Sequence, residues 1–265
     1  MKRIFAFVLA LLALCCGAGL AQDGEPAEKI GIICAMDNEV ALLLSEAEID
    51  HVDTVGGVDF HVGTLHDQPV VIIRSGIGKV LAASAVTAML NRYPVSRVIF
   101  TGVAGGVGDE VKLLDEVIAT RLVQHDYGVI GNDGFHWSDG VVAEDEGEKG
   151  YYFCDSALVD LAFECAVQVM GAEHVFQGTI ATGDQFVASG DYVKTLHEQF
   201  DAVACEMEGA SVAAVCTQYG VPFVVIRSMS DKADGNAHES IENFGDLAAD
   251  NSSRIVIRMM DALNP

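Results

Sequence analysis

The chain has 265 residues, of which 51% are hydrophobic, and it carries 39 acidic against 15 basic residues for a net charge of −24. A surface this acidic repels nucleic acid and anionic lipid, which proteins bind through basic patches, so both are excluded as partners. The length suits one large domain with a substantial core.

The first 21 residues have the pattern of an export signal. Lys2 and Arg3 precede an unbroken apolar run at 4–14, and a small-residue segment ends at Ala21. We therefore predict cleavage after Ala21, a secreted or periplasmic location, and a mature domain at 22–265 without membrane attachment. A membrane anchor is the alternative, but the apolar run is shorter than the ~20 residues of a spanning helix.

The seven cysteines do not predict a disulfide framework. Cys15 and Cys16 fall in the leader and allow lipoprotein processing as a further alternative, although the residues before them fit it poorly. The others are odd in number and irregularly spaced, and several lie in apolar runs typical of core thiols. Export permits a disulfide, but the sequence selects no pair among Cys34, Cys154, Cys165, Cys205 and Cys216.

Apolar segments and turn residues predict strands that alternate with helices. In chain order we expect a strand at 29–35, a helix at 37–46, a hairpin within 51–64, a strand at 69–74, a helix at 80–91 and a strand at 97–101. A long surface loop follows at 125–150, then a helix at 156–170, a strand at 175–182, a helix at 191–200, a strand at 202–205, a helix at 207–219, a strand at 222–229 and a helix at about 243–263. This alternation predicts an α/β fold, a single three-layer α/β/α domain whose mixed, mostly parallel sheet is flanked by helices.

Distinctive polar and glycine residues fall just after several strands, where ligands bind in such folds. They are Glu39, Ser75 to Gly78, Gly102 to Gly106, Phe186, Glu206 to Glu208 and Arg227 to Asp231. The glycines permit close approach of the backbone to a ligand, but neither segment is a dinucleotide fingerprint or a P-loop. The scattered histidines predict no metal site, and we expect no organic cofactor.

These residue types suit the cleavage of an N-glycosidic bond. Positive charge builds on the ribose while the departing base gains negative charge, so an acid, a water-orienting base and carboxylates near the ribose are needed. Asp231 is the candidate acid, Glu39 the candidate base, and Glu206 and Glu208 can hold ribose hydroxyls. Phe186 can stack on a purine. Each residue alone also fits a structural role, such as a cap or a core position, so only the joint pattern carries the hypothesis.

Six segments then occur in a recognisable order. They are 30–40 (IGIICAMDNEV), 75–80 (SGIGKV), 101–106 (TGVAGG), 181–186 (ATGDQF), 206–210 (EMEGA) and 227–231 (RSMSD). From about residue 29 to the C-terminus the chain resembles the 5′-methylthioadenosine/S-adenosylhomocysteine nucleosidases of the nucleoside phosphorylase superfamily.

The resemblance implies hydrolysis of 5′-methylthioadenosine, S-adenosylhomocysteine or 5′-deoxyadenosine. Glu39 would activate the attacking water with help from Arg227 and Glu208, and Asp231, steadied by Ser230, would protonate adenine. The base side would be formed by Phe186, Val187, Cys205 and Glu206, and the ribose and 5′ pocket by Ala35, Met36, Ile77, Met207 and Glu208. The resemblance also implies a homodimer, in which the segment after Gln124 helps to close the 5′ pocket of the neighbouring subunit.

Water rather than phosphate is the expected co-substrate. Phosphorylases of the superfamily need arginines near the first loop and before the glycine-rich turn, and a serine in that turn. This chain has Asp37, Glu39, Phe100 and Val103 at those places, and desolvating a phosphate there would cost several kcal/mol. Many family members carry serine where Val103 stands, and the loop at 125–150 is unusual, so the 5′ preference stays open.

Three alternatives stay open. One is a nucleosidase for another purine nucleoside, such as futalosine or inosine, and another is a phosphorylase. The third is a periplasmic nucleoside-binding protein without catalysis. The joint presence of Glu39, Glu208, Arg227 and Asp231 argues against the third, because a binding protein needs no water-activating carboxylate.

Overall fold

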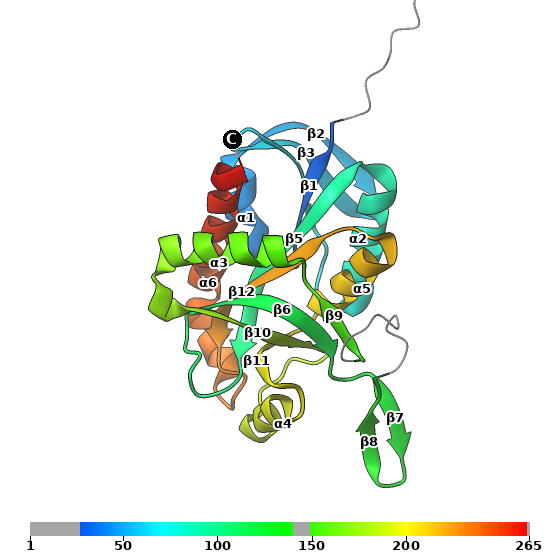
Figure 1. Ribbon diagram of the computed structural model, residues 1–265, viewed down its shortest axis with the longest axis vertical. Coiled ribbons are helices and arrows are strands. Elements are labelled where there is room, and N and C mark those ends of the chain that lie inside the picture. Colours follow the sequence, from blue (N-terminus) through cyan, green and yellow to red (C-terminus); the bar gives the residue numbers. More distant parts are fainter. Residues whose placement is uncertain (1–26, 140–148, 264–265) are drawn as a thin grey trace, which may run out of the picture.

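The computed structural model describes residues 27–139 and 149–263 (Figure 1). The predicted leader at 1–21 lies outside the described residues. The strands are β1 (Lys29–Cys34), β2 (Ala47–Val55), β3 (Val58–Leu65), β4 (Gln68–Arg74), β5 (Val95–Gly106), β6 (Glu116–Gln124), β7 (Gly128–Gly131), β8 (Gly134–Trp137), β9 (Tyr151–Phe153), β10 (Val175–Thr182), β11 (Ala202–Glu206) and β12 (Phe223–Asp231). The helices are α1 (Asp37–Glu46), α2 (Lys79–Arg92), α3 (Ser156–Met170), α4 (Gly190–Phe200), α5 (Gly209–Tyr219) and α6 (Ala237–Leu263), with a short 3₁₀ turn at Ala172–His174.

A ten-stranded mixed sheet forms the centre, in the order β11-β10-β6-β12-β5-β1-β4-β3-β2, with β9 beside β6. The central run β4–β1–β5–β12 is parallel, whereas the outer hairpin strands β2, β3 and β4 pair antiparallel. Strand β11 pairs with both β10 and β5, so β5, β12, β6, β10 and β11 close into a ring. This ring brings the ends of β5, β11 and β12 together at one place.

Helices cover both faces of the sheet, which confirms the predicted fold class (Figure 1). Helices α1, α3 and α6 pack together on one face, and α2 packs against α5 on the other. The core follows from the apolar strands: Ile32 and Ile72 point to the first face, and Ile33 and Ile73 point to the second. The sheet is therefore buried on both sides, as continuous apolar strands require.

Local signals explain where several helices begin and end. Asp155 caps α3 by accepting from the amide of Leu158, and Ser189 caps α4 by accepting from the amide of Tyr192. Helix α5 ends at Gly220, whose positive φ of 67° places it in the left-handed region that favours glycine.

Some predictions of helices, strands and loops were wrong, and some strands were not predicted. The segment at 125–150 is not one loop, because β7 and β8 form an antiparallel hairpin within its described part. Strand β6 was not predicted, since Glu116 and Arg121 interrupt its apolar pattern. Helix α6 begins at Ala237 rather than near Asn243. The prediction began too late because the first turns of the helix are polar and resemble a loop. These turns lie beside the pocket, which Ile241 lines.

The five cysteines of the described part are free thiols, and all except Cys154 are buried. Within residues 27–139 and 149–263, no helix is long and apolar enough to cross a membrane. The same residues contain no cluster of three side chains suited to a metal ion.

Candidate active site

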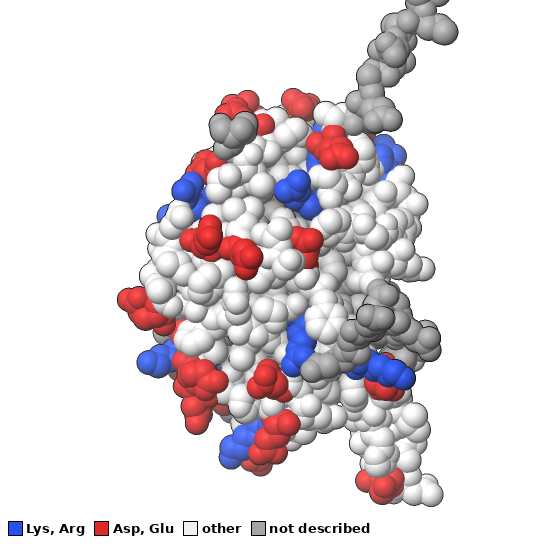
Figure 2. Space-filling view, viewed as in Figure 1, with Lys and Arg blue, Asp and Glu red and all other residues white. Residues whose placement is uncertain are grey.

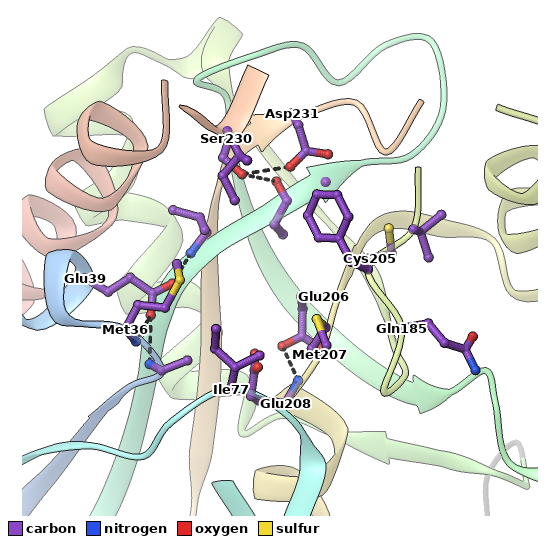
Figure 3. A pocket seen from close by; sticks show the side chains of 17 residues that line it. Met36, Glu39, Ile77, Gln185, Cys205, Glu206, Met207, Glu208, Ser230 and Asp231 are labelled. Atoms are coloured by element: carbon purple, nitrogen blue, oxygen red, sulfur yellow. Dashed lines mark hydrogen bonds between the residues drawn. The ribbon is translucent and has the colours of Figure 1, made fainter. Parts of the chain in front are cut away.

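A pocket at the carboxyl ends of the strands collects almost all of the predicted residues (Figure 3). Its empty volume of about 630 Å³, counted to its open mouth, lies in the range of small-molecule sites. The lining residues are Ala35, Met36, Glu39, Ile77, Val103, Ala104, Gly105, Gln185, Phe186, Val187, Cys205, Glu206, Met207, Glu208, Ser230, Asp231 and Ile241. Among the predicted site residues only Arg227 does not line the pocket, because it is fully buried behind the pocket wall.

Glu39 is a buried carboxylate held by three backbone amides. Its Oε2 accepts from the amides of Ala35 and Met36 and its Oε1 from the amide of Val103, each at 2.8 Å. The bond to Met36 closes a capping box, so the first turn of α1 fixes the direction of the carboxylate. Burial raises the pKa of Glu39, although Arg227 and the three amides oppose that rise. A raised pKa suits a group that has to accept a proton.

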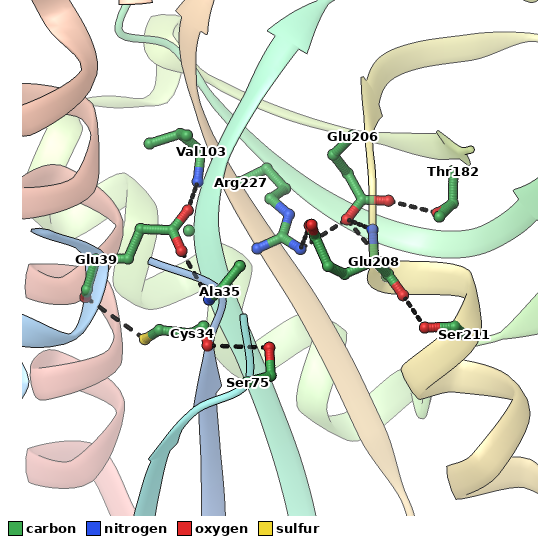
Figure 4. A network of polar contacts seen from close by, with 12 residues as sticks. Cys34, Ala35, Glu39, Ser75, Val103, Thr182, Glu206, Glu208, Ser211 and Arg227 are labelled. Atoms are coloured by element: carbon green, nitrogen blue, oxygen red, sulfur yellow. Dashed lines mark hydrogen bonds and ion pairs between the residues drawn. The ribbon is translucent and has the colours of Figure 1, made fainter. Parts of the chain in front are cut away.

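Arg227 lies between Glu39 and two further carboxylates (Figure 4). Its Nη2 donates to Glu206 Oε2 at 2.7 Å and lies 3.8 Å from Glu208 Oε2. The guanidinium packs over the ring of Phe100, 4.0 Å from the centroid. Burial lowers its pKa, but the three carboxylates outweigh burial, and the pKa lies above its usual value. The guanidinium of Arg227 therefore keeps its positive charge behind the pocket wall.

Glu206, the last residue of β11, and Glu208, the N-cap of α5, use their carboxylates differently. Glu206 accepts from the hydroxyl of Thr182 and from the amides of Glu208 and Gly209, in addition to the guanidinium. Its carboxylate is thus occupied by protein donors, although the residue lines the pocket as predicted. Glu208 accepts from the amide of Gly78 at 2.7 Å. Burial, with the nearby Glu206 charge, raises the pKa of Glu208 to about 8.

Asp231 is the last residue of β12, rather than part of the polar loop after it, and lies on a different side of the pocket from Glu39 (Figure 3). Its Oδ2 accepts from the hydroxyl of Ser230 at 2.9 Å, and its Oδ1 from the amide of Ala233 at 2.7 Å. Burial raises the pKa of Asp231 above its usual value, against the effect of these two hydrogen bonds. A carboxyl whose pKa is raised is protonated more readily, which suits an acid catalyst.

Strand β5 passes close to both carboxyls, which explains two of its glycines. A Cβ on Gly102 would lie 2.3 Å from Glu39 Oε1 and 2.7 Å from Arg227 Nη1. A Cβ on Gly105 would lie 2.8 Å from Asp231 Oδ1. Only glycine leaves room for the carboxylates at these two positions.

The predicted base side of the pocket carries an aromatic ring at its mouth. Phe186 is 40% exposed, and its ring lies 4.6 Å from that of His238 with a tilt of 32°. Val187 lines the wall beside it, together with Cys205. Burial raises the pKa of the Cys205 thiol, so it contributes as a neutral, mainly apolar group.

Besides Val103, which the comparison of co-substrates already named, four lining residues were given no role by the sequence predictions. Ile241 belongs to the early turns of α6, which the sequence assigned to a loop. Gln185 precedes Phe186 in a segment already singled out, and Ala104 and Gly105 lie within the glycine-rich segment. The motifs therefore contained three of the four, whereas no local signal indicated Ile241.

Comparison with known proteins agrees with this geometry. A sequence model of the phosphorylase superfamily matches residues 29–261. The 5′-methylthioadenosine/S-adenosylhomocysteine nucleosidase of Shewanella sediminis is 39% identical over 236 residues, which cover 89% of this chain and 100% of the relative.

Two solved structures from Helicobacter pylori are similarly close. An aspartate-to-asparagine variant of the nucleosidase, with 5′-methylthioadenosine in its active site, has a TM-score of 0.80 and 36% identity and covers 90% of this chain and 100% of its own. A futalosine hydrolase has a TM-score of 0.79 and 36% identity and covers 89% of this chain and 98% of its own. The chain belongs to the phosphorylase superfamily and, within it, to the 5′-methylthioadenosine/S-adenosylhomocysteine nucleosidase family.

Proposed function

We propose that the protein hydrolyses the N-glycosidic bond of 5′-methylthioadenosine, S-adenosylhomocysteine or 5′-deoxyadenosine, releasing adenine and a 5-substituted ribose. The observation that carries this proposal is the pairing of Glu39 and Asp231 in one pocket, as two buried carboxyls with raised pKa values. The named nucleosidase relatives and the bound 5′-methylthioadenosine in one of them support the same reaction.

Asp231 is the proposed acid. The hydroxyl of Ser230 and the amide of Ala233 fix the rotation of its carboxyl group. Its proton passes to N7 of adenine as the bond from the ribose to the base breaks, so the base leaves as a neutral molecule. Acid catalysis of this kind contributes about 10²–10⁴-fold to a rate.

Glu39 is the proposed base for the attacking water. Three amides hold its carboxylate in place, so no reorganisation is needed when the water loses its proton. The oxygen of the water bonds to C1′ of the ribose, and its proton passes to Glu39. Glu208 helps to hold the water from the pocket wall, and Arg227, buried behind that wall, assists through its charge on Glu39 and Glu208.

The remaining lining residues are proposed to hold the nucleoside. Glu208 and Met207 lie beside and beneath the ribose, where the Glu208 carboxyl can hydrogen-bond to a ribose hydroxyl. Met36 and Ile77, with Ala35, form the ribose and 5′ side. The base lies against Phe186 and Val187, with Cys205 and the Glu206 backbone on the same side.

Water is the proposed co-substrate because the groups around Arg227 suit a neutral molecule better than an anion. The ring of Phe100 covers one face of Arg227, and Glu39 and Glu208 lie on either side. A phosphate dianion entering there would meet the acidic side chains of Glu39 and Glu208, with no arginine in the pocket lining.

The test is adenine release from 5′-methylthioadenosine by residues 22–265, with and without phosphate. Equal release in both conditions, together with free methylthioribose, is the expected result. Release that requires phosphate would make the protein a phosphorylase. Binding without release from any of the three nucleosides would make it a binding protein.

Futalosine is the second candidate substrate. The futalosine hydrolase of Helicobacter pylori is as similar to this chain as the nucleosidase, at 36% identity each. The two substrates differ in the purine base and at the 5′ position, so both the Phe186 side and the Ile77 side of the pocket bear on the choice. Comparison of kcat/KM for futalosine and 5′-methylthioadenosine distinguishes them, and we expect the second to exceed the first.

We further propose a homodimer. The β7–β8 hairpin projects from the body and exposes Val129 (63%), Ile130 (84%) and Phe135 (47%), and its visible surface is largely uncharged (Figures 1 and 2). Exposed apolar residues on a projecting element are typical of protein interfaces. Light scattering should give twice the monomer mass, and Ile130→Asp should shift it to one monomer, unlike the exposed α3 variant Asp160→Asn. A wild-type monomer at micromolar concentration would contradict this.

Export of the mature chain remains a proposal supported by the sequence at 1–21 alone. Mass spectrometry of the protein from the extracytoplasmic fraction should find Gln22 as its first residue. Protein that is confined to the cytoplasm and keeps Met1 would contradict the prediction.

A further inference from the structure

Three charged residues, two from the recognised segments and one from the segment after Gln124, have no part in the proposed chemistry, yet the structure brings them together. Lys79 begins α2, Asp126 follows β6, and Asp184 follows β10. The Nζ of Lys79 lies 2.6 Å from Asp126 Oδ1, with side chains only 17% and 11% exposed. We call Lys79, Asp126 and Asp184 the clamp.

The contacts of the clamp form a closed ring. Asp126 Oδ2 accepts from the amide of Asp184 at 2.8 Å, and Asp184 Oδ1 accepts from the amide of Lys79 at 2.8 Å. The Lys79 ammonium closes the ring on Asp126 and also donates to Gln124 Oε1 at 3.1 Å. Two of the ring contacts end on backbone amides, so the ring fixes the course of the chain as well as the side chains.

Each backbone segment in the ring leads directly to the pocket. The residue before Lys79 is Gly78, whose amide donates to the Glu208 carboxylate, and before it stands Ile77 in the pocket wall. After Asp184, the chain continues into Gln185, Phe186 and Val187, which line the pocket.

Electrostatics support a stable ring. Burial would raise the pKa of Asp126, but the Lys79 ammonium and the Asp184 amide lower it below its usual value. The lowered pKa favours the ionised Asp126 carboxylate, which accepts from both partners. Gly78 contributes the necessary turn, because its φ of +97° is in the left-handed region, and a Cβ there would lie 3.1 Å from Asp184 Oδ1.

We propose that the clamp is a positioning device that sets the spacing between the ribose-side turn at 76–78 and the base-side loop at 185–187. None of its three residues lines the pocket, so it governs how tightly an adenine nucleoside is held rather than how fast its bond breaks. This inference rests on the proposed function only in the choice of ligand.

Asp184→Ala removes the acceptor for the Lys79 amide and should raise KM for 5′-methylthioadenosine about tenfold, with kcat within about threefold of wild type. Asp184→Asn keeps an acceptor at Oδ1 and should restore most of the affinity. Asp160→Ala, which removes an exposed aspartate from α3, is the matched control and should leave both constants unchanged.

A double-mutant cycle separates positioning from loss of folding. Asp126→Ala and Asp184→Ala break the same ring, so the double variant should raise KM little more than either single variant. Thermal melting of each variant identifies any that is unfolded. Independent effects on KM, or a fall in kcat with KM unchanged, would overturn the clamp.

A binding measurement tests the clamp even if the proposed reaction does not occur. If wild-type protein releases no adenine from any of the three nucleosides, the proposed function is wrong, but calorimetry with adenine still tests the clamp. Weaker adenine binding by Asp184→Ala than by Asp160→Ala would support it, and equal binding would overturn it.

Discussion

The backbone amide of Val103 donates to Glu39 Oε1 over 2.8 Å, so strand β5 and helix α1 hold the same carboxylate from opposite sides. Two serines of α6 reinforce this junction: Ser252 accepts from the amide of Gly102, and Ser253 donates to the carbonyl of Glu39. The position of the proposed base is thus fixed by three separate elements.

Glu39→Gln should lower kcat at least about 100-fold, because the amide cannot accept the proton of the water. It should also lower the stability by about 1–3 kcal/mol, since its NH₂ group must face at least one of the three amide donors. Turnover and thermal melting measure the two effects. Ser253→Ala is the control, with a lower melting temperature but near-normal kcat; a Glu39→Gln variant with normal turnover would remove Glu39 from the mechanism.

Asp231→Asn should lower kcat at least about 100-fold without unfolding the protein. The Asn Oδ1 can still accept from the amide of Ala233, so the geometry survives while the transferable proton is lost. Ser230→Ala should have a smaller effect, because it removes only one orienting hydrogen bond. Steady-state kinetics measure kcat, and circular dichroism shows whether each variant is folded. Near-normal turnover of Asp231→Asn would refute its role as the acid.

Glu208 should make the folded state less stable as the pH rises. Its folded pKa of about 8 lies above its ordinary value, so its contribution is complete below about pH 4.5 and is lost as the pH rises through 8. The slope from this group reaches at most about 1.4 kcal/mol per pH unit. Melting temperatures between pH 5 and 9 should fall less for Glu208→Gln than for wild type. Glu164→Gln, on the exposed side of α3, should follow the wild-type curve.

Glu116 is a buried carboxyl opposite Ser228 on the paired strand β12; burial raises its pKa well above the usual value, and the Ser228 hydroxyl opposes that rise only in part. Its stability contribution is present at acidic pH and declines as the pH rises towards the folded pKa. Glu116→Leu should therefore raise the melting temperature by a few degrees, and more at pH 8 than at pH 5. An unchanged or lower melting temperature at pH 8 would show that the Ser228 hydroxyl stabilises the ionised Glu116 carboxylate sufficiently.

The sequence predicted the elements whose apolar pattern is continuous. Helix α1 and helix α3 were predicted with the observed bounds, because each has a clear start signal and an apolar face. Strand β6 escaped prediction because its charged residues meet partners that are distant in the sequence: Arg121 donates to Thr179 and packs over Tyr151. These contacts, which stabilise a charged side chain within the sheet, depend on the pairing of strands and are not encoded in the local sequence.

The sequence predicted which residues form the site better than it predicted the hydrogen bonds between them. Motif order placed Glu39 and Asp231 in one pocket, but their roles stay predictions until variants are measured. That Thr182 and two amides occupy the Glu206 carboxylate depends on how β10 meets β11, which no local pattern encodes. The contact between Phe186 and His238 likewise joins two segments 52 positions apart in the chain.

Strand β12 is buried along its whole length and is bordered by β5 and β6. Arg227 lies in the middle of it, opposite Gly102 on one side and Val117 on the other. Backbone amides in such a strand exchange with solvent deuterium only when the whole domain opens, whereas exposed rim segments exchange by local opening. Hydrogen exchange should therefore find the strand that bears Arg227 among the slowest parts of the protein, and the loop that bears Phe186 among the faster ones. Mild denaturants should then weaken substrate capture well before they disturb the buried cation.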